Sequence, residues 1–238
     1  MSQHHIDVFF SVMPFLLQGF AETLKLSLVG VLWGSVLGAL LGIIRGQQIA
    51  FFSPLIGAYI HILRGTPFLV QLYIAYFVLP NTGLAWLMWD SQTAAFASLG
   101  IYTSSYVTEI VSAAIRAIPR GQWEASFAVG FTRMQSLRHV ILPQSVGLIM
   151  PSLGGVYVNL IKATSIVSVV GIAELTRQGE ISILRFPADI LYIYLLVALL
   201  YFAFCFPVLM TVDWLERRTK VGAKYGTAVL SGRLEAAE

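Results

Sequence analysis

Charged side chains are scarce in this sequence: Lys, Arg, Asp and Glu together make up 11% of its 238 residues. A soluble domain carries about a quarter charged residues and about 45–50% apolar ones, whereas 57% of this chain is hydrophobic. The composition excludes a disordered chain, because disorder requires a high charge and few large apolar residues. We therefore expect an all-α, polytopic membrane protein.

Cysteines and long basic runs are also missing. A single cysteine excludes a disulfide scaffold. The net charge is +3, but no five basic residues are consecutive, so we expect no nucleic-acid partner. The first fourteen residues contain neither Lys nor Arg, which argues against a removable signal peptide. His61 and His139 fall far apart in the expected topology, so no metal site is expected.

Apolar runs long enough to cross a bilayer are present, since a spanning helix needs about 20 such residues. Five spans are predicted, at about 18–45, 52–79, 93–117, 146–171 and 189–213. They make residues 1–238 a single transmembrane domain.

The second span is interrupted by Arg64-Gly65-Thr66-Pro67. Either one helix is kinked at Pro67, which lacks a backbone donor, or Thr66 caps a new helix with Pro67 in its first position. We favour one kinked span, because the run from Phe68 to Leu79 has only 12 residues.

The Lys and Arg residues between the spans predict the orientation, because cytoplasmic loops are enriched in them. With the N-terminus outside, only Arg177 and Arg185 fall in outer segments. The inner segments then hold ten basic residues: Arg45, Arg116, Arg120, Arg133, Arg138, Arg217, Arg218, Lys220, Lys224 and Arg233. We expect the N-terminus outside and the C-terminus in the cytoplasm.

Glycine recurs every fourth residue in the first span, at Gly30, Gly34, Gly38 and Gly42. Small residues at this spacing let helix backbones approach closely within lipid. We expect a packing seam, whose partner is either a helix of the same chain or a second subunit.

The loop at 118–145 is the longest polar segment between spans. Gln122 to Val129 is expected to form a short helix that ends at Gly130. Thr132 and Gln135 match a capping box at the start of a second short helix, which we expect Pro143 to terminate.

The residue types and spacing of this loop resemble the EAA loop of ABC-importer permeases: Glu-Ala-Ala, three residues, Gly, nine residues, Ile, one residue, Leu-Pro. Ser126 replaces the third-position Ala and Val140 replaces Ile. The matching positions are Glu124, Ala125, Ser126, Gly130, Val140, Leu142 and Pro143.

Further segments resemble the polar-amino-acid branch of these permeases, which takes up histidine, glutamine, arginine or cystine. They are Arg64 to Gln71, Tyr106 to Ile110, Ile118 to Ala125 and Gly171 to Gln178. The resemblance covers the chain from about Pro14 to Glu216. It implies five spans with the N-terminus outside, in the bacterial inner membrane.

The resemblance also implies the partners. A second permease subunit, identical or homologous, would complete the pore, and an extracytoplasmic binding protein would deliver an amino-acid-like substrate. Two cytoplasmic ATPase subunits would receive the helix around Glu124 to Gly130. The chain has no glycine-rich loop ending in Gly-Lys-Ser/Thr. We therefore expect no cofactor and no catalytic residue in this chain, with ATP and Mg²⁺ used by the ATPase.

Ionisable residues inside spans mark candidate transport residues, because they are costly in lipid. Lys162 can bind a substrate carboxylate, and the alternative is a buried Lys162–Glu109 pair that fixes packing. Asn159 shares its helix face with Lys162. The candidate substrate path comprises Gln71, Glu109, Asn159, Lys162, Thr164 and Ser165.

The related permeases usually have Lys-Asp-Thr-Ser where this chain has Lys162-Ala163-Thr164-Ser165. Without that acid we expect a neutral or anionic amino acid, or a derivative, as the substrate. The main alternative function is an ion-coupled secondary transporter of small polar solutes. That function would require an ion site and usually inverted repeats, and no convincing repeat is visible.

Overall fold

The computed structural model describes residues 3–219, with side chains as far as Leu215. This part of the chain consists of helices and the segments that join them, and it contains no strand. The all-α class is confirmed. The basic tail residues counted above, from Arg217 and Arg218 to Arg233, lie outside the described side chains.

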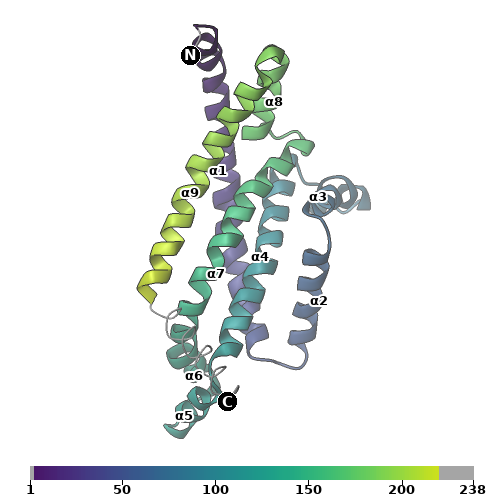
Figure 1. The fold of residues 1–238 in the computed structure, drawn as a ribbon. Coiled ribbons are helices and arrows are strands. Elements are labelled where there is room, and N and C mark those ends of the chain that lie inside the picture. The colour runs from purple at the N-terminus through teal and green to yellow at the C-terminus, as the bar shows by residue number, and fades with distance from the viewer. Residues whose placement is uncertain (1–2, 220–238) are drawn as a thin grey trace, which may run out of the picture.

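The first helix, α1, spans Gln3–Gly46 without interruption. Its 44 residues correspond to about 66 Å, twice the thickness of a bilayer core of about 30 Å. The predicted span at 18–45 covers about the last two-thirds of this helix. The helix begins earlier because Val8, Val12 and Leu16 pack against residues of α8 (Leu175–Arg185) and α9 (Ile190–Thr219). Figure 1 shows these three helices side by side.

The central helix is α4, Ser91–Ala117, which begins at an N-cap where Asp90 accepts a hydrogen bond of 2.9 Å from the Thr93 amide. Gly30, Gly34, Gly38 and Gly42 of α1 are buried against it. A Cβ added to Gly38 would lie 2.6 Å from the Val107 Cβ and 2.8 Å from the Ser104 carbonyl oxygen. The predicted seam is confirmed, and its partner is α4 of the same chain.

The second apolar run is broken into two helices, α2 (Phe52–Gly65) and α3 (Phe68–Tyr73), bent by 105° (Figure 1). Our preference for one kinked helix is wrong. Thr66 is extended, with ψ 143°, because a residue before proline is driven out of the helical region. After α3 the chain continues through a π-helical turn, η1 (Ile74–Val78), and two 3-10 turns, η2 (Leu79–Thr82) and η3 (Ala85–Leu87).

The polar loop forms α5 (Arg120–Ala128) and α6 (Arg133–Ser136), then a π-helical turn, η4 (Leu137–Ile141). The expectation that Pro143 terminates the second helix is wrong, since helix continues directly into α7, Leu142–Ala163. Pro143 lies in the first turn of α7, after the wider η4 turn. A π turn removes the tight contact between a proline ring and the carbonyl four residues earlier.

The chain leaves α7 through a 3-10 segment, η5 (Thr164–Val170), which ends at Gly171 with φ +87°. Helix α8 (Leu175–Arg185), which the sequence analysis did not predict, and a 3-10 turn, η6 (Pro187–Asp189), lead into α9 (Ile190–Thr219).

Three stretches are long and apolar enough to cross a membrane by length and composition: Gln3–Gly46, Arg133–Val170 and Pro187–Leu215. The bent pair of α2 and α3 is a fourth if it counts as one span. Helix α4 does not meet this criterion, because it carries buried hydroxyl groups such as those of Thr103, Ser104 and Ser105. Five spans are therefore not confirmed.

The two ends of the bundle differ in charge. The start of α1 and helix α8 lie at one end, and α5 and α6 lie at the other (Figure 1). Arg133 of α6 donates to the backbone carbonyl of Gln47, just after α1. Arg116 and Arg120 line a pocket at this end together with Gly46. Three of the basic residues that we assigned to one side, Arg116, Arg120 and Arg133, therefore lie at one end of the molecule.

Candidate functional site

Helix α5 and its two boundaries form the segment for which the sequence predicts coupling to an ATPase. Gly130 follows α5 with φ +88°, a backbone conformation that a residue with a Cβ rarely adopts. The predicted capping box is present: the Thr132 amide donates to Gln135 Oε1 at 2.8 Å, and the Gln135 amide donates to Thr132 Oγ1 at 3.4 Å. The turn between α5 and α6 is thus held by local backbone geometry on both sides.

The side chains of the Glu-Ala-Ser motif point in different directions. Glu124 and Ala125 are exposed, whereas Ser126 is buried. The Ser126 hydroxyl lies 2.7 Å from the Ser136 hydroxyl oxygen and joins α5 to α6. Leu142 is half-buried and Pro143 exposed in the first turn of α7.

An exposed apolar group beside Glu124 was missed by the sequence analysis. Its members are Phe127, Val129, Phe131 and Met134, with exposed fractions between 37% and 73%. Exposed apolar residues concentrated at one place on a surface mark interaction sites. The signal in the sequence was the presence of large apolar residues within an otherwise polar loop.

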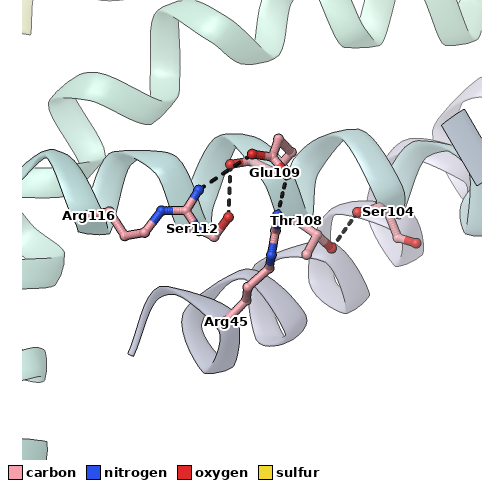
Figure 2. A network of polar contacts seen from close by, with 6 residues as sticks. All are labelled: Arg45, Ser104, Thr108, Glu109, Ser112 and Arg116. Atoms are coloured by element: carbon pink, nitrogen blue, oxygen red, sulfur yellow. Dashed lines mark hydrogen bonds and ion pairs between the residues drawn. The ribbon is translucent and has the colours of Figure 1, made fainter. Parts of the chain in front are cut away.

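A polar network links α1 to α4, and Figure 2 shows its six residues. Arg45 donates to Glu109 Oε2, and Arg116 Nη2 lies 3.5 Å from Glu109 Oε1. The alternative Lys162–Glu109 pair is wrong, because two arginines already occupy the Glu109 carboxylate. Glu109, one of the candidate path residues, therefore links α4 to α1 through its ion pair with Arg45.

The candidate residues on α7 fall into two groups. Asn159 and Lys162 are exposed on one face of the helix, and no carboxylate of residues 3–215 forms an ion pair with Lys162. Thr164 is buried and donates to the Ile161 carbonyl at 2.7 Å, while Ser165 donates to the Lys162 carbonyl at 2.7 Å. Among these four residues, only Asn159 and Lys162 present side-chain polar groups that do not hydrogen-bond to their own helix.

Gln71 braces the break between α2 and α3. Its amide nitrogen donates to the Leu63 carbonyl at 2.7 Å and to the Thr66 carbonyl at 3.1 Å. Its Oε1 is buried without a hydrogen-bond partner and lines a pocket of about 270 Å³ with Ser98. The hydrogen bonds of Gln71 thus stabilise the break between α2 and α3.

A larger pocket of about 550 Å³ lies between α2, α4 and α7. The guanidinium of Arg64 stands over the Tyr106 ring at its rim, 4.9 Å from the centroid. Arg64 was placed in the interrupted span but not proposed as a site residue. The available signal was a permanent charge within an apolar run. The side chains that line this pocket include Arg64, Tyr106, Glu109, Ile110, Leu148 and Ser152.

A buried carboxylate, Glu174, was also missed. It is fully buried and caps α8, accepting from the Thr176 and Arg177 amides at 2.9 and 2.8 Å, and from the Tyr201 hydroxyl at 3.0 Å. Burial raises the pKa of the Glu174 carboxyl, and these hydrogen bonds oppose the rise. Glu174 holds α8 in place against α9.

Residues 30–221 match the family described as the binding-protein-dependent transport system inner membrane component. The chain is 38% identical over 210 residues to the glutamine transport system permease protein GlnP of Escherichia coli (strain K12), covering 87% of this chain and 94% of GlnP. It is 33% identical over 217 residues to the probable glutamine ABC transporter permease protein GlnM of Bacillus subtilis (strain 168), covering 90% of this chain and 97% of GlnM.

Solved structures agree. A crystal structure of an amino acid ABC transporter with histidines has a TM-score of 0.78 and 33% identity, with 88% of this chain and 96% of that chain covered. The MetNI methionine ABC transporter in an inward-facing conformation has a TM-score of 0.71 at 22% identity, covering 92% of this chain and 99% of that chain, and shares the fold.

The family match and the relatives place the chain in the class of ABC-importer permeases. The chain belongs to the family of binding-protein-dependent transport system inner membrane components, and within it to the permeases of polar amino acid ABC importers. The resemblance recognised in the sequence is confirmed.

Proposed function

We propose that this chain is the membrane-spanning subunit of an ATP-driven importer, coupled to its ATPase through α5. The observation that carries the proposal is the exposed Glu124 and Ala125 beside an exposed apolar group at one end of the bundle. A charged residue beside apolar side chains suits a docking surface for a second protein. The coupling residues are Glu124, Ala125, Ser126, Gly130, Leu142 and Pro143.

The proposed topology has five spans, with α4 as the third. Helix α4 has 27 residues, or about 40 Å, which is enough to cross the bilayer. Its hydroxyl groups face protein instead of lipid and hydrogen-bond to its own backbone, as Thr108 Oγ1 does to the Ser104 carbonyl at 2.6 Å. The N-terminus is then outside and α5 cytoplasmic, in the bacterial inner membrane.

The proposed partners are a second permease subunit, two ATPase subunits and an extracytoplasmic binding protein. ATP and Mg²⁺ belong to the ATPase, and this chain has no catalytic role. Movement of α5 is transmitted to α6 through the hydrogen bond between Ser126 and Ser136. From α6 it is transmitted to the candidate substrate path, because helix runs without a break from Arg133 to Val170. That stretch carries Lys162. Alternating access requires the ATPase to bind the two conformations with different affinity.

The proposed substrate is a neutral or anionic amino acid or a derivative. Lys162 and Asn159 supply exposed polar groups on α7, and Ala163 supplies no acid beside them. Two relatives are named for glutamine transport, which is compatible with a neutral substrate. Strong inhibition of glutamine uptake by arginine would contradict this choice.

The proposed function is tested by co-purification and uptake. The chain, expressed with its partner genes, is expected to retain an ATPase subunit, and uptake into vesicles is expected to stop with a non-hydrolysable ATP analogue. Uptake that continues without the ATPase and follows an ion gradient would establish the alternative, a secondary transporter.

A further inference from the structure

In the proposed five-span topology, Arg64 lies near the middle of the membrane. It comes twelve residues after Phe52, the start of α2, or about 18 Å along the helix. Tyr106, on which it stacks, comes eleven residues before Ala117, the end of α4, or about 16 Å. Both helices place the guanidinium about halfway across a hydrocarbon core of about 30 Å. A charge at that depth is costly unless it faces a water-filled cavity or a partner.

No side chain or carbonyl in the described part of the chain accepts a hydrogen bond from the Arg64 guanidinium. Within residues 3–215, Arg64 makes neither an ion pair nor a hydrogen bond. The guanidinium contacts the face of the Tyr106 ring. Stacking uses the flat face of a guanidinium and leaves its in-plane donors unused. Those donors match the two oxygens of a carboxylate.

The surroundings hold Arg64 in place and favour an anion. The Tyr106 hydroxyl accepts from the Tyr102 hydroxyl at 3.3 Å, and the Tyr102 ring packs on Phe68 at the start of α3. The acidic residue lining this pocket, Glu109, is bound by Arg45 and Arg116. The electrostatic balance of this pocket is therefore positive.

We propose that Arg64 binds the carboxylate of the transported solute in the pocket of about 550 Å³ between α2, α4 and α7. The volume is within the usual range for small-molecule sites, about 300–1,000 Å³. This inference rests on the proposed transport function and adds a specificity residue to it. The pocket selects solutes that carry a carboxylate and no net positive charge, and Tyr106 orients the guanidinium.

The test uses the complete transporter in proteoliposomes. Wild-type uptake is first measured for radiolabelled L-glutamine, L-glutamate, L-cystine, L-histidine and L-arginine, and the amino acid taken up fastest becomes the probe. Arg64→Met removes the charge and keeps a long apolar side chain, while Arg64→Lys keeps the charge. Arg185→Met is the matched control, because Arg185 also stands over an aromatic ring, that of Phe15 at 5.8 Å, and belongs to α8.

We expect Arg64→Met to reduce uptake per ATP hydrolysed about tenfold or more, as loss of a charge-assisted hydrogen bond does. Arg64→Lys should retain part of the uptake, and Arg185→Met all of it. ATPase stimulation by the loaded binding protein should stay within about twofold in all three. In the wild-type complex, free amino acids should displace the bound probe and their carboxamides, which lack the carboxylate, should not. In Arg64→Met the free amino acids and the carboxamides should displace the probe equally.

The outcomes separate the two proposals. A wild-type transporter that takes up none of the amino acids overturns the proposed function and the Arg64 assignment with it. Active wild type with equally active Arg64→Met overturns the Arg64 assignment only. If both Arg64 variants lose ATPase stimulation as well as uptake, the Arg64 assignment is also overturned, since that result indicates a structural role.

Discussion

Arg45, in the last turn of α1, forms an ion pair with Glu109 in α4, next to the glycine seam that joins the two helices (Figure 2). The side chain of Arg45 is 14% exposed and that of Glu109 is 32% exposed. Charges this far from water depend on each other, because a partly buried charge without a partner loses its hydration without compensation. The pair therefore ties the end of α1 to the centre of the bundle.

Removing one member of this pair is expected to cost more than removing both. Glu109→Leu leaves Arg45 without its main partner and should lower the free energy of unfolding by about 1–3 kcal/mol, less than the figure for a fully buried pair. The double variant Arg45→Met/Glu109→Leu should recover part of that loss. Thermal or denaturant unfolding of the purified protein measures both. A loss in the double variant equal to the sum of the losses in Glu109→Leu and Arg45→Met would mean that the pair has no coupling energy.

The glycine seam predicts a large effect from one methyl group. Gly38→Ala places a Cβ 2.8 Å from the Ser104 carbonyl oxygen, which cannot move independently of α4. We expect a loss of about 1–3 kcal/mol in unfolding free energy. Gly57→Ala is the control, because its Cβ would have no atom closer than 4.0 Å, and alanine should gain up to about 1 kcal/mol there. Similar behaviour of the two variants in an unfolding assay would argue against tight α1–α4 packing.

Glu174 predicts a pH dependence. Its pKa in the folded protein is raised by burial above the ordinary value of 4.5, so folding favours the neutral form. The contribution of Glu174 to the free energy of unfolding is fully present below pH 4.5 and is lost as the pH rises through the folded pKa. The loss is about 1.4 kcal/mol for each unit by which folding raises the pKa.

The measurement is the unfolding free energy of wild type minus that of Glu174→Gln, taken from below pH 4.5 to neutral pH. It should fall as pH increases, since the glutamine does not ionise. Asp7→Asn removes an equal charge from an exposed position of α1 and controls for a general charge effect. A difference between wild type and Glu174→Gln that stays constant with pH would contradict the prediction.

The coupling segment predicts variants that insert and hydrolyse ATP but transport poorly. Glu124→Lys reverses the charge of the exposed docking residue, and Gly130→Asp introduces a Cβ at φ +88°. We expect each to reduce uptake per ATP hydrolysed at least tenfold in vesicles. Gly83→Asp is the control, since Gly83 has φ +77° in the segment between η2 and η3 and shares the strain without lying on the coupling segment. Normal uptake by both coupling variants would refute the assignment of α5.

Patterns that depend on neighbouring residues were predictable. The capping box at Thr132 and Gln135 and the glycine turn at Gly130 depend on backbone groups within four residues, and both are present. The glycine seam was visible for a related reason, because a helix repeats its faces every three to four residues. Its partner was not visible, since that depends on which helix returns to the same face.

Predictions that required a comparison of local preferences with packing were less successful. Pro143 stops an isolated helix, but the π-helical turn before it lets the helix continue into α7. Pro67 was expected to kink one helix, yet the chain separates into two helices, with Gln71 bonded across the break. In both cases hydrogen bonds outside the proline's immediate neighbours decide the outcome.

The sequence by itself determined the membrane class, the all-helical fold and the family, because each depends on composition or on spacing along the chain. Only the tertiary structure decided which charges have partners. Glu109 was paired with Lys162 in one interpretation, but it binds Arg45 and Arg116, and Arg64 stands without a carboxylate partner within the described residues. Ion pairs form between residues brought together from distant helices, and the sequence carries no distance between those helices until they pack.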